Sequence, residues 1–135
     1  MPGSAEMIQF INRDEDMHLQ VFLQMTKTIK EEQPELWTDE FKARITKNFI
    51  GACEHEISWG VSCIDEGILG LNPDNLTQYI QFVTDVRLSQ VGLDKQFNVE
   101  NPFPWIDEIT QGNMIEVNFF EGVVKEYSTG TLDWD

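Results

Sequence analysis

The chain has 135 residues, of which 41% are hydrophobic, and its 9 basic and 24 acidic residues give a formal charge of −15. This length suits a single domain, and the excess of acid repels nucleic-acid phosphates and anionic membrane surfaces. No stretch approaches the roughly 18 apolar residues of a membrane span, and no secretory signal is present, so composition predicts a cytoplasmic protein without nucleic-acid or membrane partners.

The first predicted helix runs from an N-cap at Ser4 to about Lys30, shortly before Pro34 ends the pattern. One face of this helix follows the alternating three- and four-residue spacing of a side that faces a core. Two consecutive positions on that face, Glu15 and His18, are polar. We call this face the first-helix seam, and its members are Ile8, Ile11, Glu15, His18, Phe22, Met25 and Ile29.

A carboxylate and an imidazole among apolar side chains need partners, because burying an unpaired charge is costly. An inward Glu-x-x-His is how helical bundles hold carboxylate-bridged two-metal centres. The spacing alone arises readily by chance, and a Glu–His pair satisfied by hydrogen bonds to other side chains is the alternative. A complete centre also needs a second Glu-x-x-His and two further acidic ligands, so Glu15 and His18 form half of a site.

Two more helices follow. Thr38 predicts the N-cap of the second, and Asn72 with Pro73 predicts the start of a third that Gly92 closes. Their inward faces are predicted to be Phe41, Ile45, Phe49, Ala52, Glu56, Trp59 and Cys63, and then Leu76, Tyr79 or Ile80, Val83, Arg87 and Val91.

Five polar or reactive side chains of these helices are given structural roles. We expect Glu56 and Arg87 to form a polar network rather than to bind metal. We expect His55 to lie on the solvated surface. Cys53 and Cys63 lie about 15 Å apart along one helix and cannot bond to each other there. We therefore expect both cysteines to be reduced, partly buried thiols.

After Gly92 the character of the chain changes. Prolines and aromatics in 101–105 predict an irregular segment over the bundle surface. Residues 128–135 predict a flexible tail, in which Leu132 and Trp134 stand between acids as in a docking peptide; a frayed end with incidental hydrophobic residues is the alternative. The fold class is therefore all-α, with one domain over 1–127 and a tail over 128–135.

Several segments resemble, in order and spacing, the small radical-generating (beta) subunit of class I ribonucleotide reductase. The resemblance covers essentially the whole chain. The matching segments are Pro2-Gly3-Ser4 through Arg13-Asp14-Glu15-Asp16-Met17-His18, Gly70-Leu71-Asn72, Gln78-Tyr79-Ile80, Arg87-Leu88, Val91-Gly92-Leu93, Asn101-Pro102-Phe103, Asn118-Phe119-Phe120-Glu121 and Glu126-Tyr127.

The resemblance implies the C-terminal part of a ferritin-like helical bundle. The bundle would hold a dinuclear metal centre, with Fe/Fe expected first and Mn/Fe or Mn/Mn as alternatives. That centre would react with oxygen and store an oxidising equivalent. The large subunit would use this equivalent to convert ribonucleotides into deoxyribonucleotides.

The resemblance also implies roles for individual residues. Glu15 and His18 would be metal ligands, and Asp14 would be the neighbouring carboxylate of the radical-transfer chain. Tyr127 would pass the radical across the subunit interface, with Glu121 as an associated carboxylate. The terminal peptide that docks on the large subunit would include Leu132, Asp133, Trp134 and Asp135.

Members of this family are more than twice as long as this chain. The part that would precede Met1 carries the first Glu-x-x-His, two other acidic ligands and the radical-storing tyrosine. We therefore expect the chain to act only with a complementary N-terminal half and the large subunit, as part of a small subunit that assembles into a homodimer. Alone, it should self-associate or partly unfold because its bundle faces are exposed.

Two alternatives remain open. The first is a non-catalytic fragment that docks on the large subunit through Leu132 and Trp134. The second is another ferritin-like carboxylate oxidase, which the Tyr127 tail disfavours because such an oxidase needs no radical exit.

Overall fold

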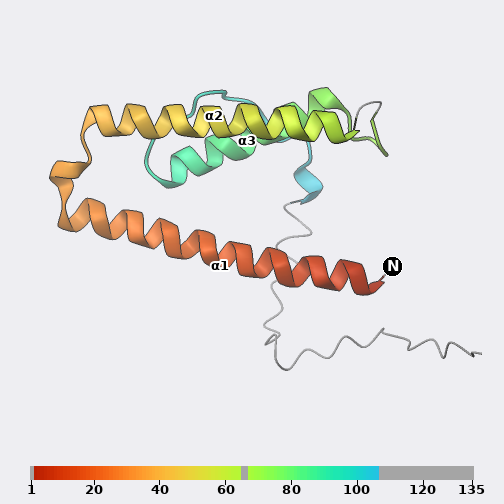
Figure 1. The fold of residues 1–135 in the computed structure, drawn as a ribbon, viewed down its shortest axis with the longest axis horizontal. Helices are drawn as coiled ribbons and strands as arrows, with labels where there is room; N and C mark the ends of the chain where they lie inside the picture. Colours follow the sequence, from red (N-terminus) through yellow and green to blue (C-terminus); the bar gives the residue numbers. More distant parts are fainter. Residues whose placement is uncertain (1, 65–66, 107–135) are drawn as a thin grey trace, which may run out of the picture.

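A computed structural model describes residues 2–64 and 67–106 of the chain. These residues form the helices α1 (Pro2–Glu32), α2 (Asp39–Ile64) and α3 (Pro73–Gln90), with a short 3-10 helix, η1 (Pro34–Leu36), between the first two. Figure 1 shows α2 and α3 lying side by side, whereas α1 lies apart from them and is joined to α2 through η1. The all-α fold class is confirmed for the described residues.

The caps predicted for α2 and α3 are present. The backbone N–H of Phe41 donates to Thr38 Oγ1 at 3.1 Å. Asn72 and Asn75 cap each other reciprocally, because each backbone N–H donates to the other residue's Oδ1, at 2.8 and 2.9 Å. Gly92 follows α3 with a φ of +74°, which suits a residue without Cβ.

The start of α1 differs from the sequence prediction. The helix begins at Pro2, so Ser4 lies inside it and is not its N-cap. Proline is well suited to the first helical position because it lacks an N–H that would need a partner. The core side of α1 is unaffected by this two-residue difference.

The core lies between α2 and α3. Among the described residues, the buried hydrophobic side chains are Cys53 on α2 and Leu88 on α3. Gly60 permits close contact of the two helices, since a Cβ there would lie 3.0 Å from Leu76 Cδ2. With so few side chains buried, this hairpin of helices supplies only a small part of an ordinary core.

Asp85 is a buried carboxylate that fastens the segment after α3 to the helix. It is 2% exposed, and it accepts backbone N–H bonds from Gln96 at 2.7 Å, Phe97 at 3.1 Å and Asn98 at 2.6 Å. Burial raises the pKa of this carboxyl, but the three amides and the nearby Lys95 outweigh that effect, so the pKa lies below its ordinary value.

Lys30 joins the end of α1 to the end of α3. Its Nζ donates to the carbonyl oxygen of Val91 and lies 4.1 Å from the centroid of the Trp37 ring. Burial, followed by the positive charge of Lys42, lowers the pKa of the Lys30 ammonium. This joint holds the C-terminal end of α1 in place.

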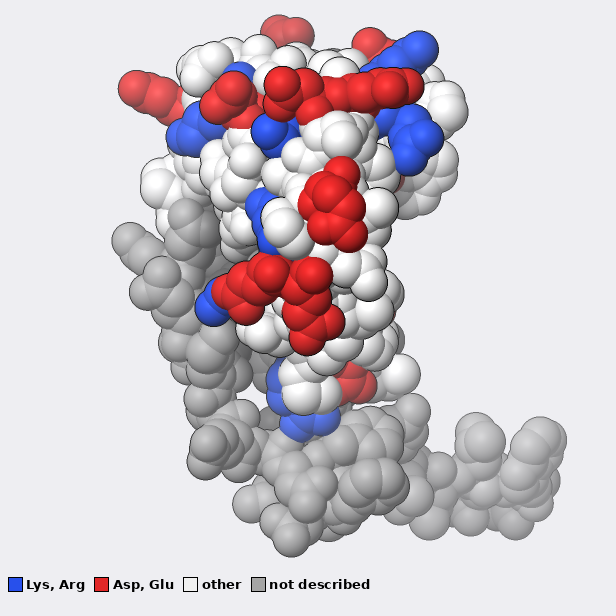
Figure 2. Space-filling view, turned by 90° about the vertical axis from the view of Figure 1, so that its left-hand side faces the viewer, with Lys and Arg blue, Asp and Glu red and all other residues white. Residues whose placement is uncertain are grey.

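The surface carries the excess of acid. Figure 2 shows acidic side chains spread over one face of the molecule and interleaved with basic ones. None of the helices in the described ranges is long and apolar enough to span a lipid bilayer.

Candidate functional site

The two residues predicted as metal ligands lie one turn apart on α1. Glu15 Oε2 and His18 Nδ1 are 3.5 Å apart, and their side chains are 71% and 65% exposed. The sequence correctly predicted that they share a face, but the expectation that this face is buried is wrong for the described residues. The helical spacing reports which residues face the same way, and it does not report whether a partner covers them.

The apolar members of the first-helix seam are exposed as well. Their exposed fractions run from 46% at Ile29 to 65% at Phe22. A contiguous apolar stripe of this kind on a soluble helix marks a surface that another element covers. The seam is therefore a helix face that lacks its partner among the residues that the structure describes.

We asked whether the residues present fit a two-metal centre. Within 2–64 and 67–106, no group of three or more His, Cys, Asp or Glu side chains could hold a metal ion. Glu15 and His18 offer one carboxylate and one imidazole, which are donors that suit Fe, Mn or Zn. This set does not fit a two-metal centre without ligands from elsewhere.

Asp14, the predicted radical-transfer carboxylate, is held by its neighbour in sequence. Arg13 donates from Nη2 and Nε to Asp14 Oδ1 at 3.2 and 3.4 Å. The Arg13 guanidinium also lies over the Phe10 ring, 5.4 Å from its centroid. The structure thus gives Asp14 a cationic partner next to the Glu15–His18 pair.

The other predicted site residues, Glu121 and Tyr127, lie outside the described residues. So do the docking residues of the terminal peptide, which are Leu132, Asp133, Trp134 and Asp135. Their roles remain predictions.

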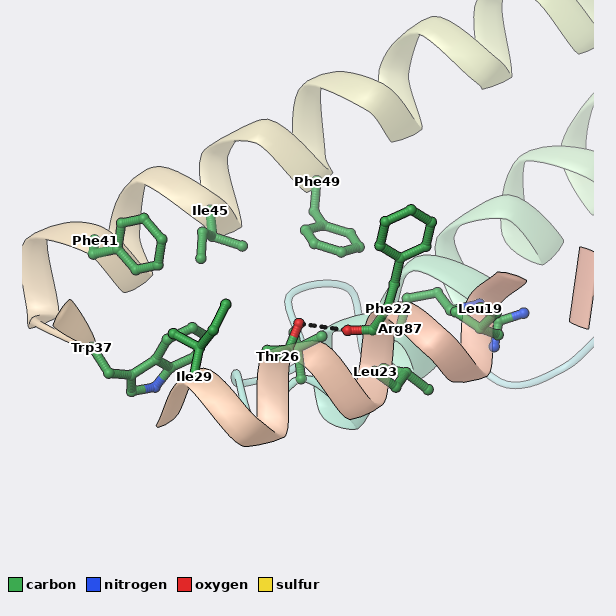
Figure 3. Close-up of a pocket in the computed structure, with 11 residues that line it drawn as sticks. Leu19, Phe22, Leu23, Thr26, Ile29, Trp37, Phe41, Ile45, Phe49 and Arg87 are labelled. Atoms are coloured by element: carbon green, nitrogen blue, oxygen red, sulfur yellow. Dashed lines mark hydrogen bonds between the residues drawn. The ribbon is translucent and has the colours of Figure 1, made fainter. Parts of the chain in front are cut away.

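An apolar cavity of about 380 Å³ opens between α1, α2 and the end of α3. Figure 3 shows Phe22 and Ile29 of α1 pointing toward Ile45 and Phe49 of α2 across it. The sequence placed each of these residues on a core-facing side, but periodicity gives no information on the distance between helices. The lining residues are Leu19, Phe22, Leu23, Thr26, Ile29, Trp37, Phe41, Ile45, Phe49, Arg87 and Val91.

The predicted polar network between α2 and α3 is only partly present. Glu56 and Arg87 line the same hollow, but Arg87 Nη1 donates to Gln90 Oε1 at 3.0 Å. His55 is exposed, as predicted. Cys53 and Cys63 are both free thiols; Cys53 is buried and Cys63 is exposed, so neither matches the expected partial burial.

Sequence reasoning missed Asp85 and Lys30. The partners of Asp85 are backbone amides eleven to thirteen residues away, and the partner of Lys30 is a carbonyl 61 residues away. Side-chain periodicity carries no signal for such contacts. The position of Asp85 between apolar residues near the end of α3 was the one sequence signal that this aspartate is buried and needs a partner.

The helix arrangement and the Glu-x-x-His on an uncovered helix define part of a ferritin-like helical bundle. Residues 1–102 match the family model described as ribonucleotide reductase, small chain. The R2 subunit structure from Clostridium botulinum is similar at a TM-score of 0.75 and 31% identity, covering 79% of this chain and 34% of that chain. The chain belongs to the ribonucleotide reductase small-chain family.

Two curated relatives show how much of such a protein is present. The ribonucleoside-diphosphate reductase subunit beta of Chlamydia pneumoniae is 41% identical over 135 residues, which cover 99% of this chain and 39% of that protein. The subunit beta of Treponema pallidum is 31% identical over 133 residues, which cover 95% of this chain and 38% of that protein. The chain thus spans about two fifths of the relatives it matches.

Proposed function

We propose that this chain acts as the C-terminal part of a ribonucleoside-diphosphate reductase small subunit in the cytoplasm. It would supply Glu15 and His18 to a dinuclear metal centre that a complementary N-terminal chain completes. The assembled small subunit would form a homodimer and serve a large subunit in deoxyribonucleotide synthesis. Family membership and the names of the relatives support this proposal.

The observation that carries the proposal is the exposed first-helix seam. Glu15 and His18 stand within a stripe of apolar side chains, and each member of the stripe is 46% exposed or more. Burying such a stripe against a helix stabilises both by roughly 25 cal/mol per Å² of apolar surface. A neighbouring helix with acidic and histidine ligands would complete both the core and the donor set.

In this assembly, the residues of this chain would bind the metal centre, continue the radical-transfer route and dock on the large subunit. The Glu15 carboxylate and His18 imidazole would hold the centre, for which Fe/Fe is proposed first and Mn/Fe or Mn/Mn as alternatives. When bound, the centre would supply one-electron oxidation. Asp14, fixed by Arg13, would lie on the transfer route beside the histidine, and Glu121 and Tyr127 would continue it. The residues Leu132, Asp133, Trp134 and Asp135 would dock on the large subunit.

Complementation tests the proposal. The partner would be the part of the Chlamydia pneumoniae relative that precedes its match to this chain. After reconstitution with iron or manganese under oxygen, metal analysis and electron paramagnetic resonance should detect a centre in the mixture and none in either chain alone. His18→Ala should remove that centre.

His55→Ala is the matched control, because it removes the other histidine from an exposed helix position. A mixture in which both variants bind metal as well as the unaltered chain would refute the assignment. If no centre forms but the chain still binds the large subunit until residues 128–135 are deleted, the chain is a docking fragment instead.

A further inference from the structure

Residues 94–106, which we call the strap, return from the C-terminal end of α3 along the hairpin (Figure 1). The first part of the strap is held by Asp85, whose carboxylate accepts the backbone N–H groups of Gln96, Phe97 and Asn98. Asn98 has a φ of +54°, which non-glycine residues rarely adopt, and its N–H bond to Asp85 Oδ2 holds that conformation in place. Asp85 therefore fixes where the strap begins.

The later part of the strap is held by the first half of α3. Gln78 Nε2 donates to the carbonyl oxygen of Glu100 at 2.9 Å. The rings of Tyr79 and Phe103 pack with their centroids 5.5 Å apart. Gln78 precedes Asp85 by seven residues, which is about 10 Å along a helix axis. Two separate anchors on α3 thus fix both the position and the direction of the strap.

The strap sets the point from which the rest of the chain continues. Its last residue, Ile106, donates its backbone N–H to the carbonyl oxygen of Phe103 at 3.0 Å, so the strap ends close to the contact of Phe103 with Tyr79. Without the strap, the last fixed point would be Val91 at the end of α3. Val91 follows Tyr79 by twelve residues, or about 18 Å along the axis.

A displacement of this size matters for the route that is proposed to follow. Residues 107–135 include Tyr127 and the docking peptide. Chemistry that depends on orientation is sensitive to the position of its groups, and about 1 Å of misplacement can cost roughly a hundredfold in rate. Binding through a terminal peptide depends less on where the chain starts, because the peptide keeps its own side chains.

We propose that Asp85 and Gln78 are positioning residues for radical transfer to the large subunit, which they serve by holding the strap on α3. This inference rests on the proposed function. Both residues lie on α3, whereas the proposed metal ligands Glu15 and His18 lie on α1. Loosening the strap should therefore slow turnover without removing the metal centre and without weakening the docking of the terminal peptide.

Amide hydrogen exchange of the full chain tests the first anchor. Asp85→Asn keeps the size of the side chain but replaces one accepting oxygen by an amide group that donates. The amides of residues 96–98 should then exchange about tenfold faster or more. Asp94→Asn is the matched control, because it alters an exposed carboxylate of the same strap, and its rates should equal those of the unaltered chain. Equal rates in the two variants would overturn the role of Asp85 as an anchor.

Turnover of the complemented small subunit with a large subunit tests the positioning role. The small subunit is this chain mixed with the N-terminal part of the Chlamydia pneumoniae relative and loaded with metal. Asp85→Asn and Gln78→Leu should each lower kcat about tenfold or more. Metal content, the electron paramagnetic resonance signal and the KM for the large subunit should stay unchanged in both variants. Asp94→Asn should match the unaltered chain in every measurement.

The outcomes separate this inference from the proposed function. A normal kcat in both variants would overturn the positioning role and leave the proposed function standing. A metal content that falls in step with kcat would also overturn it, because the two residues would then act on folding alone. An unaltered mixture that forms no metal centre would overturn the proposed function, and the positioning role with it.

Discussion

The α2–α3 hairpin and α1 show the same sequence periodicity but different degrees of burial. In the hairpin, the buried side chains Cys53 and Leu88 lie beside the predicted inward positions rather than on them, and the predicted inward Trp59 is 66% exposed. The buried Asp85 has its hydrogen-bond partners. On α1, the predicted inward positions are largely exposed. Periodicity therefore indicates which residues share a side of a helix, and it does not establish which side another element covers.

The largest expected effect is a loss of stability when the hydrogen bonds of Asp85 in the α2–α3 hairpin are removed. Asp85→Ala leaves the amides of Gln96, Phe97 and Asn98 without their acceptor, and should lower the free energy of unfolding by about 3 kcal/mol. Urea denaturation followed by circular dichroism measures the change. The control is Asp94→Ala, which alters an exposed carboxylate of the same segment and should shift the free energy by less than about 0.5 kcal/mol.

The pH dependence of stability tests the contribution of Asp85 in a second way. Because the folded-state pKa of Asp85 lies below its ordinary value of 3.8, its contribution to stability is present above that pH and is lost as pH falls through the folded-state pKa. Between pH 6 and pH 3 the unaltered chain should lose more stability than Asp85→Asn. Parallel losses in the two proteins would show that the Asp85 hydrogen bonds contribute little.

A smaller effect concerns the joint between the two regions. Lys30→Met keeps the aliphatic stem but removes the bond to the Val91 carbonyl and the ammonium from the Trp37 ring, so about 1 kcal/mol of stability should be lost. Hydrogen exchange should rise in 29–37. The matched control is Lys27→Met, whose ammonium makes only an exposed ion pair with Glu31 at 4.0 Å. An equally large loss of stability in Lys27→Met would mean that the effect comes from the charge on α1 and not from the contacts of Lys30.

Local signals allowed much of the fold to be predicted from the sequence. Thr38, Asn72 and Gly92 fix helix ends through contacts within a few residues, and those predictions are confirmed. The candidate site was predicted less completely. The spacing predicted that Glu15 and His18 share a helix face. Their exposure could not be predicted because it depends on elements beyond the helix.

Long-range contacts explain what was missed. Asp85 and Lys30 act through backbone groups far along the chain, and side-chain patterns do not encode such partners. The cavity behind Phe22 was also missed, because helix faces predict which side chains meet and not how closely two helices approach. The roles of Tyr127 and the terminal peptide stay predictions from the family resemblance.

Amide hydrogen exchange across α1 tests the central claim most directly. In the metal-free monomer, amides of residues 8–29 should exchange at least tenfold faster than those at the centre of α3, because the first-helix seam is uncovered. Adding the complementary N-terminal chain should slow them to the rate of α3. Strong protection of α1 in the metal-free monomer, or no added protection with the N-terminal chain, would contradict the account.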